Sequence, residues 1–260
     1  SMTIVFFVGL MDDVINLKWS RKIILELIAA FLAVFVAHVR ITTFHGLFGV
    51  GQLPEWFSIC FSMFVCVALV NSFNLLDGID GLASGMAIFI SAAFGFWIYR
   101  LGFFNYAILS LTLTGGLIPF FVFNVFGKKN KIFMGDCGSL LLGFLFSILA
   151  MKILCCEVSP NNALYMKSLP IVVMGVMIMP IIDTIRVFSY RIIRGKSPFS
   201  ADRTHLHHVL LDLGLNHLQA SVAIIVINIT LALITFLLRD LNPELLLVIL
   251  IAMSLTISMI

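Results

Sequence analysis

Charged side chains are scarce in this sequence. Asp, Glu, Lys and Arg make up 11% of its 260 residues, whereas a soluble globular domain carries roughly 25%. Hydrophobic residues make up 61%, and the mean hydropathy is +1.13. A chain of this composition lacks the polar surface that a soluble domain needs, which excludes an ordinary water-soluble fold.

Cysteine motifs are also lacking. The five cysteines form no CxxC pair, so neither a zinc ribbon nor a thiol redox motif is supported, and we expect them to be packing residues. The net charge of +3 is small, and we expect no nucleic acid as a partner. Segments of about 10 residues with alternating polarity, which a transmembrane barrel requires, are not seen either.

What the sequence does contain is long apolar runs, close to the roughly 20 residues that cross a bilayer as a helix. They predict an all-α, polytopic integral membrane protein, with residues 1–260 forming one transmembrane domain. We expect eight complete helices and a partial one at the N-terminus. The expected spans are 22–37, 56–70, 82–99, 106–126, 139–154, 169–188, 218–238 and 245–260, with 3–11 as the partial helix.

The partial helix is too short to cross a bilayer. We expect it to be the end of a helix whose beginning lies outside this sequence. Ser1 ahead of Met2 resembles the scar of a removed tag and is left out of the reasoning. We therefore expect the chain to be a shortened version of a longer protein.

Basic residues indicate the orientation. When successive loops alternate sides, eleven of the sixteen Lys and Arg share the side of the loop that follows Met11. Cytoplasmic loops carry an excess of Lys and Arg, so this side is predicted to be cytoplasmic. The same side holds four polar loops, near 12–22, 71–82, 127–139 and 190–217.

The first loop contains "GLMDDVINLKWSRK". Two adjacent carboxylates at the C-terminal end of a helix repel each other and face the negative end of its dipole. Asp12 and Asp13 could bind a divalent cation or accept a proton; the alternative is a solvated helix end. Arg21 or Lys22 could neutralise a phosphate.

The second loop contains "NSFNLLDGIDGL", with polar residues three apart. On a helix, Asn71, Asn74 and Asp77 would share one broad face, and polar groups within apolar helices mark functional sites. The glycines that follow allow a ligand to approach closely. The alternative is that Asp77 and Asp80 cap the next helix.

The third loop contains "KIFMGDCGSLLLG", and a helix is expected to begin near Ser139. A helix N-terminus suits phosphate, and the carboxylate of Asp136 beside it suits Mg²⁺. As an alternative, Asp136 is a plain N-cap.

The fourth loop contains "SPFSADRTHLHHVLLDLG". His205 and His208 lie on one helical face with Arg203 nearby, which indicates a pocket of donors for a polyanion. A zinc site and plain amphipathic packing are the alternatives. Asp183, in the preceding apolar run, is expected to form a structural pair with Arg186 at i+3.

Carboxylates, amides, His and Arg at one membrane surface are the groups used in metal-assisted phosphoryl transfer. A soluble phosphorylated donor would arrive from the cytosol and a lipid acceptor from the bilayer.

Taken in order, "GLMDD", "NSFNLLDGIDGLASG", "FMGDCGSLLLG" and "DRTHLHHVLLDLG" resemble the polyprenyl-phosphate N-acetylhexosamine-1-phosphate transferases. His-Leu-His-His resembles the WecA- and TagO-type branch, which starts O-antigen, enterobacterial common antigen and teichoic acid synthesis, more than the related MraY. The resemblance implies attack by undecaprenyl (polyprenyl) phosphate on the β-phosphate of a UDP-HexNAc, with UDP-GlcNAc favoured. The products are a polyprenyl-diphosphate sugar and UMP. It also implies Mg²⁺, with Mn²⁺ as the alternative ion, and a bacterial inner membrane with the active site facing the cytoplasm.

The motifs and the resemblance together give three sets of expected site residues. The catalytic set is Asp12, Asp13, Asp77, His205 and His207. The substrate-binding set is Lys22, Asn71, Asn74, Asp80, Phe133, Arg203 and His208. The metal ligands are Asp136 and Asn74. The resemblance assigns the base role to Asp12 with Asp13 as its partner, and the uracil contacts to Asp80 and Phe133.

The sequence departs from the family pattern at its start. The family has two further helices and a Gly-rich cytoplasmic loop before "GLMDD", and Lys18-Trp19-Ser20 replaces the common Ser-Pro-Lys. One alternative is therefore a truncated, non-catalytic homologue. Another is a cation transporter, which would need carboxylates near the bilayer midplane. A homodimer is an open alternative to a monomer.

Overall fold

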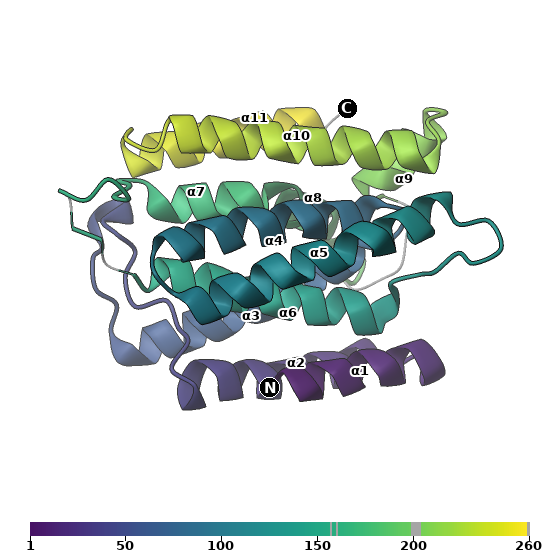
Figure 1. Ribbon diagram of the computed structural model, residues 1–260, viewed down its shortest axis with the longest axis horizontal. Coiled ribbons are helices and arrows are strands. Elements are labelled where there is room, and N and C mark those ends of the chain that lie inside the picture. The colour runs from purple at the N-terminus through teal and green to yellow at the C-terminus, as the bar shows by residue number, and fades with distance from the viewer. Residues whose placement is uncertain (157, 160, 199–203, 259–260) are drawn as a thin grey trace.

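The chain folds into a bundle of helices, most of which run along one common axis (Figure 1). The computed structural model describes residues 1–156, 158, 159, 161–198 and 204–258. Within these residues there is no β-strand, and one isolated bridge pairs Thr43 with Gln52. The prediction of an all-α fold is confirmed.

Helices cover every apolar run predicted from the sequence. The α-helices are α1 (Met2–Ile15), α2 (Trp19–Phe31), α3 (Glu55–Leu76), α4 (Leu82–Arg100), α5 (Phe104–Phe126), α6 (Gly135–Leu154), α7 (Leu169–Val176), α8 (Ile178–Ile193), α9 (Leu206–Asp212), α10 (His217–Leu237) and α11 (Pro243–Ser258). The π-helical turn η1 (Leu32–Val36) extends α2, and the 3₁₀ turn η2 (Leu47–Gly49) lies in the connection to α3.

The count of eight complete spans is not confirmed. Among the described residues, five helices (α3, α4, α5, α6 and α10) are long and apolar enough to cross a membrane. The pair α7 and α8 adds a sixth if the two count as one span, although they bend by 80°. The helix α11 has 16 residues, and α2 changes from α- to π-helical geometry at its end. A polytopic membrane protein is nevertheless the architecture that these helices support.

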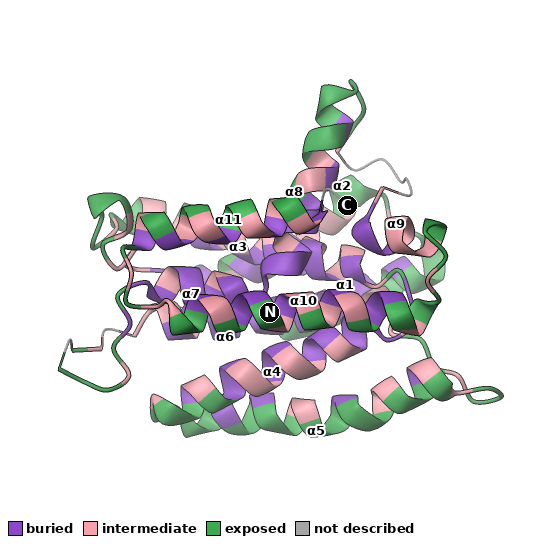
Figure 2. Cartoon of the chain, turned by 90° about the horizontal axis from the view of Figure 1, so that it is seen from above, coloured by how far each residue is buried: buried purple, intermediate pink, exposed green. Residues whose placement is uncertain are grey.

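The expected single helix over 169–188 is broken at Met177. Pro180, near the start of α8, has no N–H to donate to the carbonyl of Val176. Asn228 of α10 replaces the missing partners: its Nδ2 donates to the Val176 carbonyl (2.9 Å), and its Oδ1 accepts from the Met179 N–H (3.0 Å). The C-terminal part of α8 consequently extends away from the bundle (Figure 2).

The core lies around α6, which packs between α1 and α3. Twelve of its residues are buried, including Phe144 and Phe146. The helix α5 instead lies at the margin of the bundle, and exposed residues run along its length (Figure 2). Because its exposed face is mostly apolar, it suits contact with lipid rather than water.

The polar loops of the sequence gather at one end of this bundle. The connection between α5 and α6 and the short helix α9 lie at the right-hand end in Figure 1, whereas the connection between α6 and α7 lies at the other end. Side-chain hydrogen bonds join all four polar loops at the right-hand end. Successive connections between the long helices therefore lie at alternate ends of the bundle, as the sequence analysis assumed.

Candidate active site

The acidic pair of the first motif lies against the start of α6. The helices α1 and α6 approach so closely at Gly9 that a Cβ there would overlap the backbone of Cys137. This contact places the exposed Asp13 over the first turn of α6, where its carboxylate accepts from the backbone N–H groups of Asp136 (2.8 Å) and Cys137 (3.0 Å). The helix N-terminus that the sequence offered to a phosphate is thus occupied by Asp13.

Lys22 lies at the centre of the polar cluster. Its ammonium donates to Oδ2 of Asp12 (2.7 Å) and to Oδ1 of Asn74 (3.0 Å), and it lies 3.7 Å from Oδ1 of Asp136. Asp12 is buried and also accepts from the backbone N–H of Leu17 (2.7 Å). One cation therefore joins the first three motifs.

Asn74 and Asp136, the two expected metal ligands, are in direct contact. Nδ2 of Asn74 donates to Oδ1 of Asp136 and to Oγ of Ser139 (2.8 Å). The helix α6 begins at Gly135 rather than near Ser139, with Met134 as its N-cap. Asp136 therefore lies in the first turn of the helix, and its side chain is not the N-cap that the alternative interpretation required.

Asn71 is not part of this cluster. One helical turn deeper in α3, its Nδ2 donates to Oε2 of Glu26 (2.5 Å) and to the carbonyl of Val67 (2.9 Å). Glu26 is buried in α2 and was not singled out from the sequence. The structure thus places Asn71 in a helix–helix contact beneath the candidate site.

Asp77 follows the last turn of α3. Burial, followed by the negative charges of Asp136 and Asp13, raises the pKa of Asp77 to about 6. Neither Asp77 nor Asp80 caps the following helix α4, whose N-cap is Gly81 without a side-chain hydrogen bond. The capping alternative for this motif is therefore wrong.

Asp80 is held by the side chains of Lys131 and His217. Its Oδ2 accepts from Nζ of Lys131 (2.7 Å) and from Nδ1 of His217 at the start of α10 (2.8 Å). Burial alone would raise the pKa of Asp80, but these two partners outweigh it and hold the pKa below its usual value. Phe133 is 71% exposed, and Nζ of Lys131 lies 5.3 Å from its ring centroid. Asp80 and Phe133 therefore flank the same lysine.

The histidine motif packs on the second motif. His205 precedes α9 as its N-cap, so it is not on a helical face with His208 as the spacing predicted. The buried pair is His205 and His207, whose rings stack with centroids 5.7 Å apart and planes 12° apart. A Cβ on Gly78 would overlap the His207 ring. The glycine of the second motif is thus what allows the fourth motif to approach.

The ring of His207 is neutral at physiological pH. Burial, with the neighbouring rings of His208 and His205 adding smaller effects, lowers the pKa of His207 to about 4. His208 is half-buried, and its ring centroid lies 4.3 Å from that of His207. Arg203, also expected at the site, lies outside the described residues.

The donor set fits a divalent cation that is completed by substrate. Within the described residues there is no group of three or more His, Cys, Asp and Glu that could hold a metal ion by itself. The Lys22 ammonium already lies among oxygens of Asp12, Asn74 and Asp136, so these oxygens favour a cation. Mg²⁺ is commonly bound by one or two carboxylates together with substrate phosphates, which matches this arrangement.

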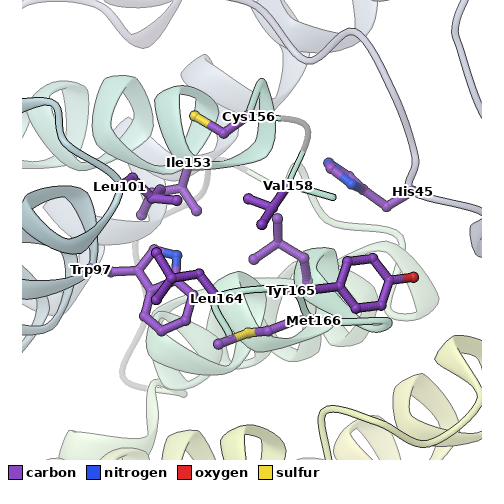
Figure 3. Close-up of a pocket in the computed structure, with 10 residues that line it drawn as sticks. His45, Trp97, Leu101, Ile153, Cys156, Val158, Leu164, Tyr165 and Met166 are labelled. Carbon is purple, nitrogen blue, oxygen red and sulfur yellow. The ribbon is translucent and has the colours of Figure 1, made fainter. Parts of the chain in front are cut away.

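Two cavities lie at the opposite end of the bundle. One, of about 20 Å³, is lined by His45, Trp97, Tyr165 and neighbouring apolar residues (Figure 3). The other, of about 410 Å³, is lined in part by Arg100 and Lys152. Neither includes a residue of the four motifs. The candidate site is instead a cluster of paired polar side chains.

Several residues of the site were missed from the sequence. Asn124 of α5 accepts from the N–H of Gly81 (2.7 Å) and donates to the carbonyl of Ile132 (2.9 Å), which fixes two of the polar loops. Lys131 and His217 were visible only as members of a basic loop and a helix start. Glu26 and Asn124 are polar residues inside apolar helices. This feature is visible in the sequence and could have identified both residues.

Comparison with known proteins gives one family and a consistent set of relatives. The sequence profile of glycosyl transferase family 4 matches residues 1–154. An undecaprenyl-phosphate alpha-N-acetylglucosaminyl 1-phosphate transferase of Yersinia pestis is 29% identical over 231 residues, which are 88% of this chain and 61% of the relative. A decaprenyl-phosphate N-acetylglucosaminephosphotransferase of Mycolicibacterium smegmatis is 30% identical over 234 residues, which are 84% of this chain and 56% of the relative.

The enzyme of Escherichia coli strain K12 with the same name as that of Yersinia pestis is 26% identical over 224 residues. These cover 85% of this chain and 59% of the relative. The chain thus spans about three fifths of the length of the curated relatives that it matches.

Proposed function

Because the chain belongs to glycosyl transferase family 4, we propose that it transfers GlcNAc-1-phosphate from UDP-GlcNAc to a polyprenyl phosphate such as undecaprenyl phosphate, releasing UMP. The names of its relatives contain both the sugar phosphate and the polyprenyl acceptor. This reaction would start the synthesis of a cell-envelope glycan. The enzyme would lie in the bacterial inner membrane with its site facing the cytoplasm.

One observation carries the proposal: four polar loops that are far apart in the sequence meet at one end of an apolar bundle. Contacts of Lys22 with Asn74, of Asp13 with the start of α6, and of His207 with Gly78 join them. A site at the end of membrane-spanning helices can receive a lipid phosphate from the bilayer and a nucleotide sugar from water. Carboxylates at one end rather than at the midplane also argue against a transporter.

Each polar side chain of the site has a separate role in the proposed phosphoryl transfer. Asp136 and Asn74 would hold Mg²⁺, or Mn²⁺, which when bound neutralises charge on the diphosphate. Lys22 is the cation within reach of the same oxygens and would bind a phosphate oxygen. Asp12 and Asp77 are the carboxylates that can receive the proton of the lipid phosphate. Asp13 would position α6, since it binds the N–H of Asp136 itself.

The loop around Asp80 suits the nucleotide end of the donor. Asp80 has an acceptor for a base N–H beside Lys131, and the exposed ring of Phe133 offers a stacking surface. His207 packs against Gly78, two residues before Asp80. In-line attack by a phosphate oxygen of the lipid on the β-phosphorus breaks its bond to the bridging oxygen, which leaves with UMP.

The test is release of UMP from UDP-GlcNAc by the purified protein in detergent. We expect release to require undecaprenyl phosphate and Mg²⁺, and to fall by roughly 10³-fold in Asp136→Ala because a positioned charge is lost. The exposed Asn105→Ala, at the far end of α5, is the matched control. Activity that survives Asp136→Ala would exclude the metal assignment, and turnover without the lipid would exclude the acceptor. A homodimer remains a prediction that sedimentation of the same sample would test.

A further inference from the structure

Asp183 connects α8 to the histidine motif. It is 6% exposed and lies in α8, between one and two turns after the α7–α8 break. Its Oδ1 accepts from Arg186 (2.8 Å), which confirms the pair predicted from the sequence, and from the backbone N–H of Leu206 (3.0 Å). Its Oδ2 contacts Nδ1 of His205 (2.9 Å). A helical i,i+3 pair accounts for only one of these three contacts.

The contact with His205 determines where the imidazole carries its proton. An ionised carboxylate can only accept hydrogen bonds, so Nδ1 of His205 must be the donor. If the ring is neutral, Nε2 then has a free lone pair; if the ring is charged, the second proton is on Nε2. In both states Nε2 is the atom that can meet a ligand. Among the described residues it has no hydrogen-bond partner.

The ring of His205 lies close to the residues of the candidate site. Its ring stacks on His207, which in turn packs against Gly78 next to Asp77. Arg186 strengthens the arrangement, because one of its NH groups bonds both Asp183 and the carbonyl of Thr204, the residue before His205. The backbone and the ring of His205 are therefore both fixed from α8.

We propose that Asp183 is a positioning residue that keeps the proton of His205 on Nδ1 and thereby presents Nε2 to a phosphate oxygen of the bound substrate. The phosphate as ligand rests on the proposed function; the control of the tautomer rests on the contacts alone. The helix break and the buried Asp183 that follows it thus orient His205 of the histidine motif.

The direct test is the tautomer of His205 in the full chain. Protein with ¹⁵N-labelled histidine, in detergent at pH 7.5, is measured by NMR, and the His205 signal is identified by its loss in His205→Gln. We expect the proton on Nδ1. A neutral ring with its proton on Nε2 in the wild-type protein would overturn the proposal. No variant of Asp183 is needed for this test.

The variant Asp183→Asn gives the second test. Asparagine has one acceptor oxygen, and two donors, Arg186 and the Leu206 N–H, favour it at the Oδ1 position. Its NH₂ group would then face Nδ1 of His205, which must accept, so the proton moves to Nε2. We expect this tautomer change and a fall in kcat of roughly 10²-fold, with a smaller effect on KM for the donor.

The matched variant is Arg186→Gln, which removes a charge from the same carboxylate but leaves Oδ2 free to accept from His205. We expect the Nδ1 proton to remain. If both variants lose activity and neither changes the tautomer, Asp183 is only structural and the proposal is wrong. A wild type that shows the expected tautomer but no UMP release would contradict the proposed function and leave the control of the tautomer standing.

Discussion

At the scale of single residues, the site depends on contacts that leave no room for larger side chains. Gly78 is the clearest case, since a Cβ there would overlap the ring of His207. Gly9 has the same role between α1 and α6. Both are small because another motif packs directly on their backbone.

We therefore expect Gly78→Ala to displace His207 or the loop that carries Asp77. Overpacking of this kind costs about 1–3 kcal/mol, and the corresponding loss of UMP release should be at least about tenfold. Gly116→Ala, on the exposed face of α5 with no atom near the added Cβ, is the matched control and should keep full activity. Equal activity of the two variants would show that the His207 contact is unimportant.

His207 also makes the stability depend on pH. Its pKa is lowered to about 4 in the folded protein, from a usual value of 6.5. The unfolded chain therefore binds this proton more readily, so the stabilisation is complete above pH 6.5 and is lost as the pH falls toward 4. Each pKa unit is worth about 1.4 kcal/mol. The charged or titratable groups around the ring are His205, His208, His217 and Asp183.

Thermal unfolding in detergent at pH 7.5 and at pH 5 measures this effect. We expect a drop in Tm on acidification that is smaller in His207→Gln than in the wild type. His38→Asn, an exposed position at the other end of the bundle, should keep the wild-type drop. An unchanged drop in His207→Gln would mean that another group controls the acid sensitivity.

At the scale of elements, the break between α7 and α8 turns α8 out of the bundle and brings Asp183 to the histidine motif. The break is stable because Asn228 satisfies one carbonyl and one N–H that the interrupted helix leaves unpaired. In an apolar interior such groups are costly when left without partners.

Asn228→Leu tests this role. It keeps the approximate volume of the side chain but leaves the carbonyl of Val176 and the N–H of Met179 without partners, which should cost about 2–4 kcal/mol. Thr230→Ala, two residues further on the exposed side of α10, should change stability by less than about 0.5 kcal/mol. The measurement is thermal unfolding of both variants in one detergent. Matching Tm values would show that the break needs no support from α10.

The same elements show how far the sequence could predict the structure. Apolar runs located every long helix, and polar residues within them located the four motifs, because both signals are local. The rotation of each helix was not predictable, since α3, α4 and α6 have apolar residues on all sides and no periodic face. Contacts that depend on rotation, such as Asn71 with Glu26, Asp13 with α6 and His205 with Asp183, required the structure.

At the scale of the whole molecule, the four polar motifs lie at one end of the bundle, and the two cavities lie at the other end. Lysines at the polar end, such as Lys129, belong to the predicted cytoplasmic side. We expect a cysteine replacing the exposed Lys129 to react with an impermeant thiol reagent only from the cytosolic side, and one replacing Asn105 only from the other side. Inside-out and right-side-out vesicles of a variant without native cysteines provide the measurement. Reaction of both positions from the same side would contradict the topology.

The proposed reaction transfers a sugar together with its phosphate. The most direct measurement uses UDP-GlcNAc carrying ³²P in its β-phosphate, with undecaprenyl phosphate and Mg²⁺, and follows the label into the lipid. We predict that the label appears in the lipid fraction with an equal amount of UMP, and that Asp136→Ala lowers both by roughly 10³-fold. Label that remains in UDP while sugar reaches the lipid would contradict the account.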